Sequence, residues 1–171
     1  MNSLKNAETA GGTATRELTH LDQNGLPRMV DVSAKRETVR EAEAEAVLWV
    51  GDKVMHAILD GKTPKGNIFE TARIAGIMGA KRTSDLIPLC HPLQLTHASV
   101  DMELRQDDIV IRTKVKTIGS TGVEMEALTA ASITALTLYD MLKALSKEMR
   151  LNGLRLIAKS GGRSGKYRAE G

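Results

Sequence analysis

The sequence predicts an α+β domain in which an antiparallel sheet is covered by helices on one face. Two observations support this prediction. Three stretches alternate between apolar and polar residues, which is typical of strands with one buried face. Segments between them are rich in Ala, Leu and Met, which favours helices. A sheet that is apolar on one side is buried by packing helices against that side.

The first strand is expected at residues 40–50, REAEAEAVLWV, although its composition suits a helix. Alanine and glutamate are both good helix formers. Its apolar residues nevertheless alternate strictly with polar ones: Ala42, Ala44, Ala46, Leu48 and Val50. We follow the period of two and predict a strand.

The other elements are expected in this order along the chain: a short helix near 52–60, a GKTPKG loop at 61–66, a helix from about 67 to 83, strands at 96–104 and 108–117 joined by a tight hairpin, a helix at about 122–147, and a last strand at 151–159. Residues expected to face inward in the hairpin are Ala98, Val100, Met102, Leu104, Ile109, Ile111, Thr113 and Val115. The order β-(αα)-β-β-α-β is the split βαβ or ferredoxin-like arrangement.

Small residues gather on one face of the helix at 67–83: Ala72, Ala75, Gly76 and Gly79. So smooth a stripe allows a second backbone to approach closely. Long helices with such faces also suggest packing against another subunit.

Length and composition indicate one domain with a leading tail. Residues 1–17 are small and polar, so we expect a disordered tail, and residues 18–171 are expected to form a single domain. No apolar run reaches the ~18 residues of a membrane span, and the N-terminus lacks the apolar segment of a signal peptide. The single cysteine excludes an internal disulfide, which fits the cytoplasm.

Positive charge is clustered along the chain. The net charge is only +3, but Lys and Arg are dense at 53–82, 112–116 and 143–168, which suits an anionic ligand such as phosphate or nucleic acid. Aromatic residues make up only 2% of the chain, and nothing resembles the aromatic pairs that stack bases in RNA-binding proteins. Composition therefore argues against a nucleic-acid partner.

A stiff, apolar loop at 85–95, DLIPLCHPLQL, carries the single cysteine. Its prolines, Pro88 and Pro92, prevent a helix or a central strand. Between them lie Cys90 and His91. We expect His91 to be half-buried with hydrogen-bonded nitrogens, in either a structural or a ligand-binding role. No second cysteine or HxxxH motif follows, so we expect no metal site and no cofactor.

The predicted helix at 122–147 contains three carboxylates, Glu124, Glu126 and Asp140. Thr121 and Glu124 have the spacing of a capping box, which would give Glu124 a structural role. Glu126 has no such explanation. Asp140 lies fourteen residues after Glu126, or ~21 Å along an ideal helix. The ligand must therefore be extended, or Asp140 of one subunit must work with residues of its neighbour.

The basic candidates also have structural explanations. Asp140 and Lys143 form an i,i+3 pair that is either an ordinary surface ion pair or functional. Lys65 lies in a loop between helices, where surface lysines are common. Lys81 ends a helix, where a cation suits the negative end of the helix dipole.

The glycine-rich C-terminal segment is not a P-loop. Ser160 stands where that motif needs a glycine, and Tyr167 stands where a hydroxyl should coordinate magnesium. Backbone amides together with Lys159, Arg163 and Lys166 could still cradle an anion. A solvated basic tail explains the segment equally well.

Four segments, in this order, closely resemble the MoaC family: MVDVSAKRETVREA, KGNIFETARIAGIMGAKRTSDLIPLCHPL, GSTGVEMEALTAASITALTLYDMLKA and RLIAKSGGRSG. The resemblance covers about residues 18–168. It implies a ferredoxin-like subunit in a homohexamer, a trimer of dimers, with active sites at the dimer interface. It also implies a lyase of molybdenum cofactor biosynthesis, which converts 3′,8-cyclo-7,8-dihydroguanosine 5′-triphosphate to cyclic pyranopterin monophosphate and releases pyrophosphate.

The resemblance also implies the site residues, position by position. Asp140, Lys65 and Lys143 match catalytic positions. Residues matching the substrate-binding positions are Leu89, Cys90, His91, Met125 and Glu126, with Lys81 and Lys159 as further basic residues of the pocket. Two other classes of function remain open: a noncatalytic ferredoxin-like module that binds RNA or another anionic partner, and a hexameric regulator that binds pterins without turnover.

Overall fold

The computed structural model describes residues 24–163 and 165–170, so the tail expected at 1–17 lies outside the described residues. The chain divides into two units at Val30 and Asp31, and the fold described here is that of the second unit. No helix in the described part of the chain is long and apolar enough to cross a membrane.

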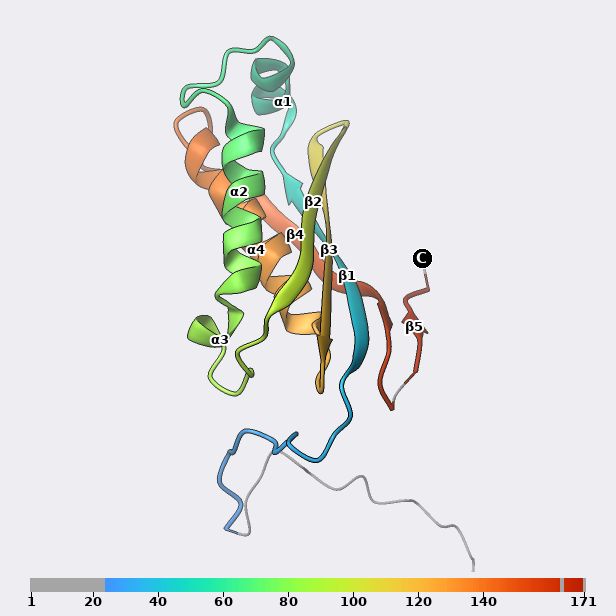
Figure 1. The fold of residues 1–171 in the computed structure, drawn as a ribbon. Coiled ribbons are helices and arrows are strands. Elements are labelled where there is room, and N and C mark those ends of the chain that lie inside the picture. Colours follow the sequence, from blue (N-terminus) through green and yellow to red (C-terminus); the bar gives the residue numbers. More distant parts are fainter. Residues whose placement is uncertain (1–23, 164, 171) are drawn as a thin grey trace, which may run out of the picture. The chain divides into compact units, whose positions relative to one another are not determined.

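Five strands form one antiparallel sheet, with helices against one face (Figure 1). The elements are β1 (Thr38–Trp49), α1 (Asp52–Leu59), α2 (Ile68–Lys81), α3 (Thr83–Leu86), β2 (Leu95–Arg105), β3 (Asp108–Gly119), α4 (Glu124–Leu142), β4 (Arg150–Ser160) and β5 (Tyr167–Arg168). The strand order is β2-β3-β1-β4-β5. The predicted α+β, ferredoxin-like arrangement is confirmed.

Two helix ends and one additional strand differ from the prediction. The helix expected at 67–83 ends at Lys81, and α3 follows as a separate turn. α4 ends at Leu142 rather than near residue 147, because the chain turns there to bury Met149 before entering β4. The C-terminal segment adds the short strand β5 to the sheet edge, which the glycine-rich sequence did not indicate.

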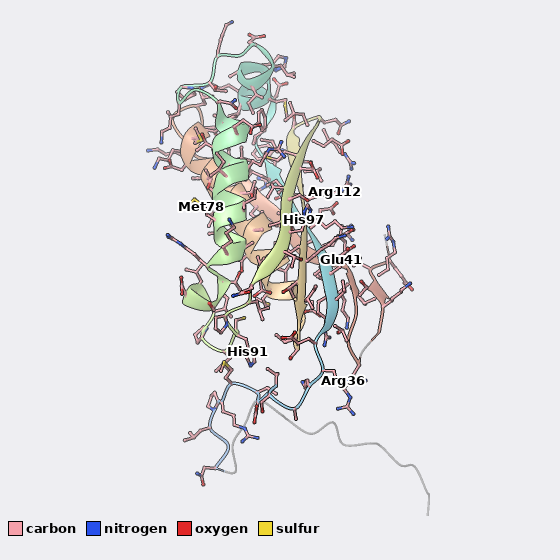
Figure 2. All side chains as sticks on the ribbon, viewed as in Figure 1. Arg36, Glu41, Met78, His91, His97 and Arg112 are labelled. Carbon is pink, nitrogen blue, oxygen red and sulfur yellow. The ribbon has the colours of Figure 1, made fainter. Side chains whose placement is uncertain are left out.

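The two faces of β1 explain why this Ala/Glu-rich segment is a strand. Its alanines are at most 1% exposed and lie beneath α4. Its glutamates point to the opposite face, where Figure 2 shows Glu41 on β1 and Arg112 on β3. Cross-strand ion pairs cover that face. Lys114 Nζ lies 2.6 Å from Glu41 and 2.7 Å from Glu43. Glu45 pairs with Arg112 and Arg155. Alternating burial and cross-strand charge therefore override helix propensity.

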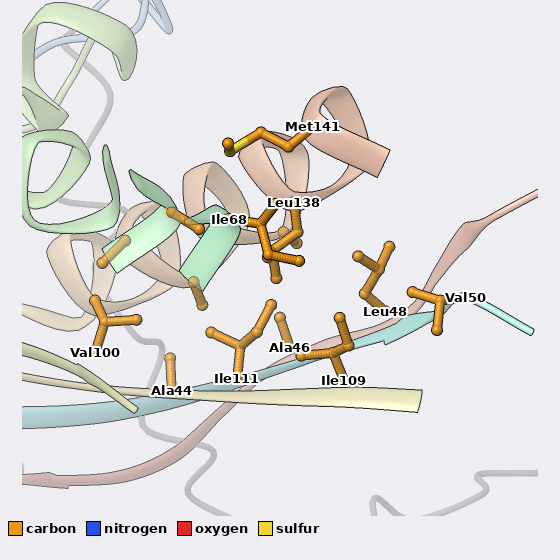
Figure 3. Close-up of a cluster of buried hydrophobic side chains, with 14 of the residues drawn as sticks. Ala44, Ala46, Leu48, Val50, Ile68, Val100, Ile109, Ile111, Leu138 and Met141 are labelled. Atoms are coloured by element: carbon orange, nitrogen blue, oxygen red, sulfur yellow. The ribbon is translucent and has the colours of Figure 1, made fainter. Parts of the chain in front are cut away.

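The core lies between the sheet and the helices α2 and α4 (Figure 3). Small side chains on both sides let α4 approach β1 closely, because four alanines of α4 are buried: Ala127, Ala130, Ala131 and Ala135. Thr113 on β3 donates a hydrogen bond from Oγ1 to the Ala127 carbonyl at 2.8 Å, which ties the sheet to the helix. Most of the residues predicted to face inward are buried or partly buried. Leu104 pairs with buried Ile109 and so lies on the same face of the sheet, but it is 36% exposed near the hairpin tip.

The glycine stripe predicted on α2 contacts α4. A Cβ atom on Gly76 would overlap Thr134 Oγ1, and one on Gly79 would lie 2.8 Å from Ile133 Cγ1. Neither glycine has a positive φ, so close approach explains them. The absence of a Cβ atom at Gly76 and Gly79 therefore allows the close spacing between α2 and α4.

We expect Gly76→Ala to lower the free energy of unfolding by roughly 2 kcal/mol or more, because the added methyl group overpacks the contact with Thr134. Denaturant unfolding measures this loss. Gly153→Ala is the matched control, since nothing lies within 4 Å of its Cβ position. Equal stability of the two variants would show that the helix contact tolerates an added methyl group.

Candidate active site

Candidate functional side chains lie at the two ends of α4. Lys65 and Lys143 surround Asp140 in its last turn, whereas Glu126 lies in its first turn. Fourteen residues separate Glu126 from Asp140, so the two ends are ~21 Å apart along the helix.

At the C-terminal end, Asp140 binds two lysines through different oxygen atoms. Lys65 Nζ lies 2.8 Å from Oδ2, and Lys143 Nζ lies 2.7 Å from Oδ1. Hydrogen bonds from Lys143 and Lys65 lower the pKa of Asp140 to about 2, and the carboxylate raises the pKa of Lys143. The structure thus brings together the three residues predicted to be catalytic, which come from a loop and a helix 75 positions apart.

Local structure in the α1–α2 loop carries Lys65 to this position. Gly61 and Gly66 adopt positive φ angles of 68° and 72°, which turn the chain sharply at each end of the loop. Thr63 Oγ1 donates to the Gly66 carbonyl at 2.9 Å, and the Asn67 side chain caps α2 by accepting from the Glu70 amide. Lys65 therefore projects from a compact turn at the start of α2.

At the N-terminal end, Glu126 is 4% exposed. Burial raises the pKa of its carboxyl group to about 7, and the charge of Glu124 acts in the same direction. Burial, together with the charge of Glu126, also raises the pKa of Cys90. Cys90 of the loop therefore lies near enough to Glu126 to be affected by its charge.

The proline-bracketed loop forms a local turn before His91 and is tied to the sheet after it. The Cys90 amide donates to the Ile87 carbonyl at 3.0 Å, and Thr117 Oγ1 on β3 donates to the Gln94 carbonyl at 2.6 Å. His91 is partly buried, as predicted, and Figure 2 shows it in the loop that precedes β2. Leu89, two residues earlier in the same loop, is 37% exposed, and Met125 in the first turn of α4 is 38% exposed.

The capping box predicted at the start of α4 is wrong. The helix begins at Glu124, with Val123 in the N-cap position and no side-chain cap. Glu124 is therefore the first helical residue rather than the third, and its carboxylate folds back over Gly122. The first amides of α4 carry no side-chain cap, and this end of the helix holds the positive end of its dipole.

A basic cavity of about 240 Å³ lies beside this end of α4. It is lined by four cationic residues, Lys35, Arg40, Lys159 and Arg163, together with Glu41, Glu124, Ser160, Gly161 and residues 120–123. Arg40 is fixed by donating to the carbonyls of Gly119 and Ser120, both at 3.3 Å. Cations outnumber carboxylates here, and hydroxyl and amide groups join them, so the cavity suits an anion.

Sequence reasoning placed Lys159 and Arg163 near an anion but missed Lys35 and Arg40. No local motif marks these two residues, because the cavity is assembled from four separate segments by the pairing of β1 with β3 and β4. Lys166 lines a neighbouring cavity of about 390 Å³ at the β5 edge instead, together with Lys159 and Tyr167.

Lys81 is exposed at the last residue of α2. Because α2 and α4 run in opposite directions (Figure 1), it lies towards the end of the helix pair that holds Glu126. Among the described residues, no group of three or more His, Cys, Asp or Glu side chains is arranged to hold a metal ion.

Comparisons with protein families and with characterised proteins agree on one family. The MoaC family model matches residues 29–162. A cyclic pyranopterin monophosphate synthase from Roseiflexus sp. (strain RS-1) is 53% identical over 153 residues, which cover 88% of this chain and 97% of that protein.

We expect Glu126→Gln to stabilise the fold more as the pH rises. The folded-state pKa of Glu126 is raised from 4.5 to about 7, so ionisation of this buried group opposes folding increasingly over that interval. Glutamine removes the effect. The gain in unfolding free energy should be small near pH 4.5 and on the order of 2 kcal/mol at pH 8.

Thermal unfolding from pH 4.5 to 8 measures this difference. Glu37→Gln, at an exposed position, is the control and should follow the wild type throughout. A stability difference for Glu126→Gln that does not change with pH would contradict the prediction.

Proposed function

The chain belongs to the MoaC family, and we propose that it is a cyclic pyranopterin monophosphate synthase of molybdenum cofactor biosynthesis. Its substrate would be 3′,8-cyclo-7,8-dihydroguanosine 5′-triphosphate, and its products cyclic pyranopterin monophosphate and pyrophosphate. The observation that carries this proposal is the 53% identity to a synthase over nearly the whole length of both proteins. The noncatalytic RNA-binding alternative is not favoured.

The N-terminal end of α4 supplies groups suited to binding this substrate. The basic cavity lined by Lys35, Arg40, Lys159 and Arg163 would hold the triphosphate, aided by the uncapped amides of the helix. The loop around His91, with apolar neighbours, would face the purine-derived ring. Lys81 would add positive charge at this end.

Buried Glu126 would exchange protons with the ring system. The reaction opens an imidazole ring, rebuilds it as a pterin and closes a cyclic phosphate, which requires repeated proton transfers. A carboxyl group with a pKa of about 7 can both give and take a proton near neutral pH.

Lys65, Asp140 and Lys143 would form the reaction centre. Two ammonium groups on one carboxylate can donate protons and neutralise the negative charge that develops as pyrophosphate leaves. The side chains of all three are about half exposed, so they are open to a ligand from outside the subunit.

The two ends of α4 would meet in one site only through a second subunit. A distance of ~21 Å along the helix exceeds the size of the reacting ring. A two-fold dimer with antiparallel neighbouring helices would bring Lys143 of one chain towards Glu126 of the other. We propose that such dimers assemble into a homohexamer in the cytoplasm.

Exposed apolar side chains on the helix layer support subunit contact. Ile74, Met78 and Leu136 are 57%, 46% and 60% exposed, and a largely apolar cavity of about 390 Å³ lies between α2, α3 and α4 beside Met78 (Figure 2). Exposed large apolar side chains are typical of protein interfaces when they form a patch.

Turnover by the purified protein tests the proposed function. The substrate is supplied by the upstream radical enzyme, and formation of the fluorescent oxidised pterin is followed together with release of pyrophosphate. Both products should appear in equal amounts. Binding of the substrate without either product would instead indicate a pterin-binding regulator.

We expect Lys65→Ala and Lys143→Ala each to reduce kcat by at least ~10²-fold, because each removes an ammonium group from the reaction centre. Melting curves should stay unchanged, since both side chains are exposed. Lys62→Ala is the matched control, because Lys62 lies in the same loop but pairs with Asp60. Near wild-type kcat in either test variant would remove that lysine from the site.

Mixing two inactive variants tests the shared site. Under conditions that exchange subunits, Glu126→Gln and Lys143→Ala chains should together recover up to about a quarter of wild-type activity, because half of randomly paired dimers are mixed and each has one intact site. Mass spectrometry confirms the exchange. Continued inactivity after confirmed exchange would mean that both residues act from the same chain.

A further inference from the structure

We propose that Asp140 is a positioning residue, which holds Lys65 and Lys143 against the substrate and does not itself exchange a proton with it. This inference rests on the proposed function and assigns a role within that reaction centre. Three observations carry it: how the carboxylate oxygens are used, where the lysines are anchored, and which groups surround them.

Both oxygens of Asp140 are already engaged. Oδ2 accepts from Lys65 at 2.8 Å and Oδ1 accepts from Lys143 at 2.7 Å. These are charge-assisted hydrogen bonds, which are stronger than neutral ones. A proton arriving at either oxygen would neutralise the carboxylate and so weaken its attraction for both ammonium groups. Each ammonium group, in contrast, has three N–H donors and uses one on Asp140, which leaves two for a ligand.

Asp140 is also the point at which the Lys65 loop is fixed to α4. Two further side-chain hydrogen bonds of this loop are local, from Thr63 to Gly66 and from Lys62 to Asp60. Only the Lys65–Asp140 bond joins the loop to α4 among the side-chain hydrogen bonds described for residues 61–66. Losing it would leave a long, flexible side chain without its anchor.

The carboxylate of Asp140 offsets the repulsion between the ammonium groups of Lys65 and Lys143. Lys65 and Lys143 both lie within 3 Å of one carboxylate, so that carboxylate must stay ionised for the pair to remain together. Tyr139 is the further titratable group beside Lys143, and its hydroxyl donates to the Lys147 carbonyl. The pKa of Asp140, lowered to about 2, agrees with a carboxylate that remains charged throughout turnover.

Two roles for Asp140 predict different pH profiles for Asp140→Asn. For a positioning residue, kcat should fall by ~10²-fold through misplacement of the lysines, with a smaller change in KM. The basic limb of the profile should also move to lower pH, because Lys143 loses the carboxylate that raises its pKa. For a proton-transfer residue, the remaining rate should instead rise with pH, because hydroxide or water would have to replace the missing base.

The experiment measures kcat and KM from pH 5 to 10 for the wild type, Asp140→Asn and the control Asp60→Asn, which breaks the Lys62 ion pair in the same loop. A second readout does not need turnover. Acylation of Lys143, followed against pH by mass spectrometry, should begin at lower pH in Asp140→Asn than in the wild type.

An unmoved basic limb, or an unchanged acylation profile if turnover is too slow to measure, overturns the proposal. Wild-type kcat in Asp140→Asn also overturns it. An inactive wild-type protein would count against the proposed function, whereas the acylation profile would still show whether Asp140 controls Lys143.

Discussion

The close packing of α4 against both the sheet and α2 is the constraint on which the rest of the structure depends. Alanines on β1 and α4 bring the helix close to the sheet, and Gly76 lets α2 come close to Thr134. Because α4 is held on two sides, the positions of both its ends are fixed. One end carries Glu126 and the other carries Asp140, so the core determines where the groups of the proposed site lie.

In the proposed mechanism, groups at opposite ends of one rigid helix act together by combining ends from two copies of the chain. Bending α4 to bring Glu126 and Asp140 together would break the alanine and glycine contacts along its length. A symmetric dimer achieves the same result without strain, since each interface then forms two equivalent sites. Rigidity inside the subunit therefore favours a site that forms between subunits.

Sequence reasoning worked where a pattern is local. The period of two in β1 and the small-residue stripe of α2 were both read correctly, because burial follows directly from spacing. It failed at the start of α4, where the Thr121–Glu124 spacing fits a capping box but the chain turns two residues later than expected. The ion pair between Lys65 and Asp140 and the cavity around Arg40 arise only when distant segments meet, so no local signal revealed those contacts.

The surroundings of Glu126 and Asp140 on α4 shift the pKa values of their carboxyl groups in opposite directions. Asp140 lies at an open surface between two ammonium groups, and its pKa falls to about 2. Glu126 is buried beside Cys90, and its pKa rises to about 7. Groups whose environments push their pKa values apart take different roles in catalysis. At neutral pH Glu126 can exchange a proton at little cost, whereas Asp140 cannot. Proton transfer to and from the ring would then fall to Glu126 and the lysines, with Asp140 as the fixed charge that keeps the lysines in place.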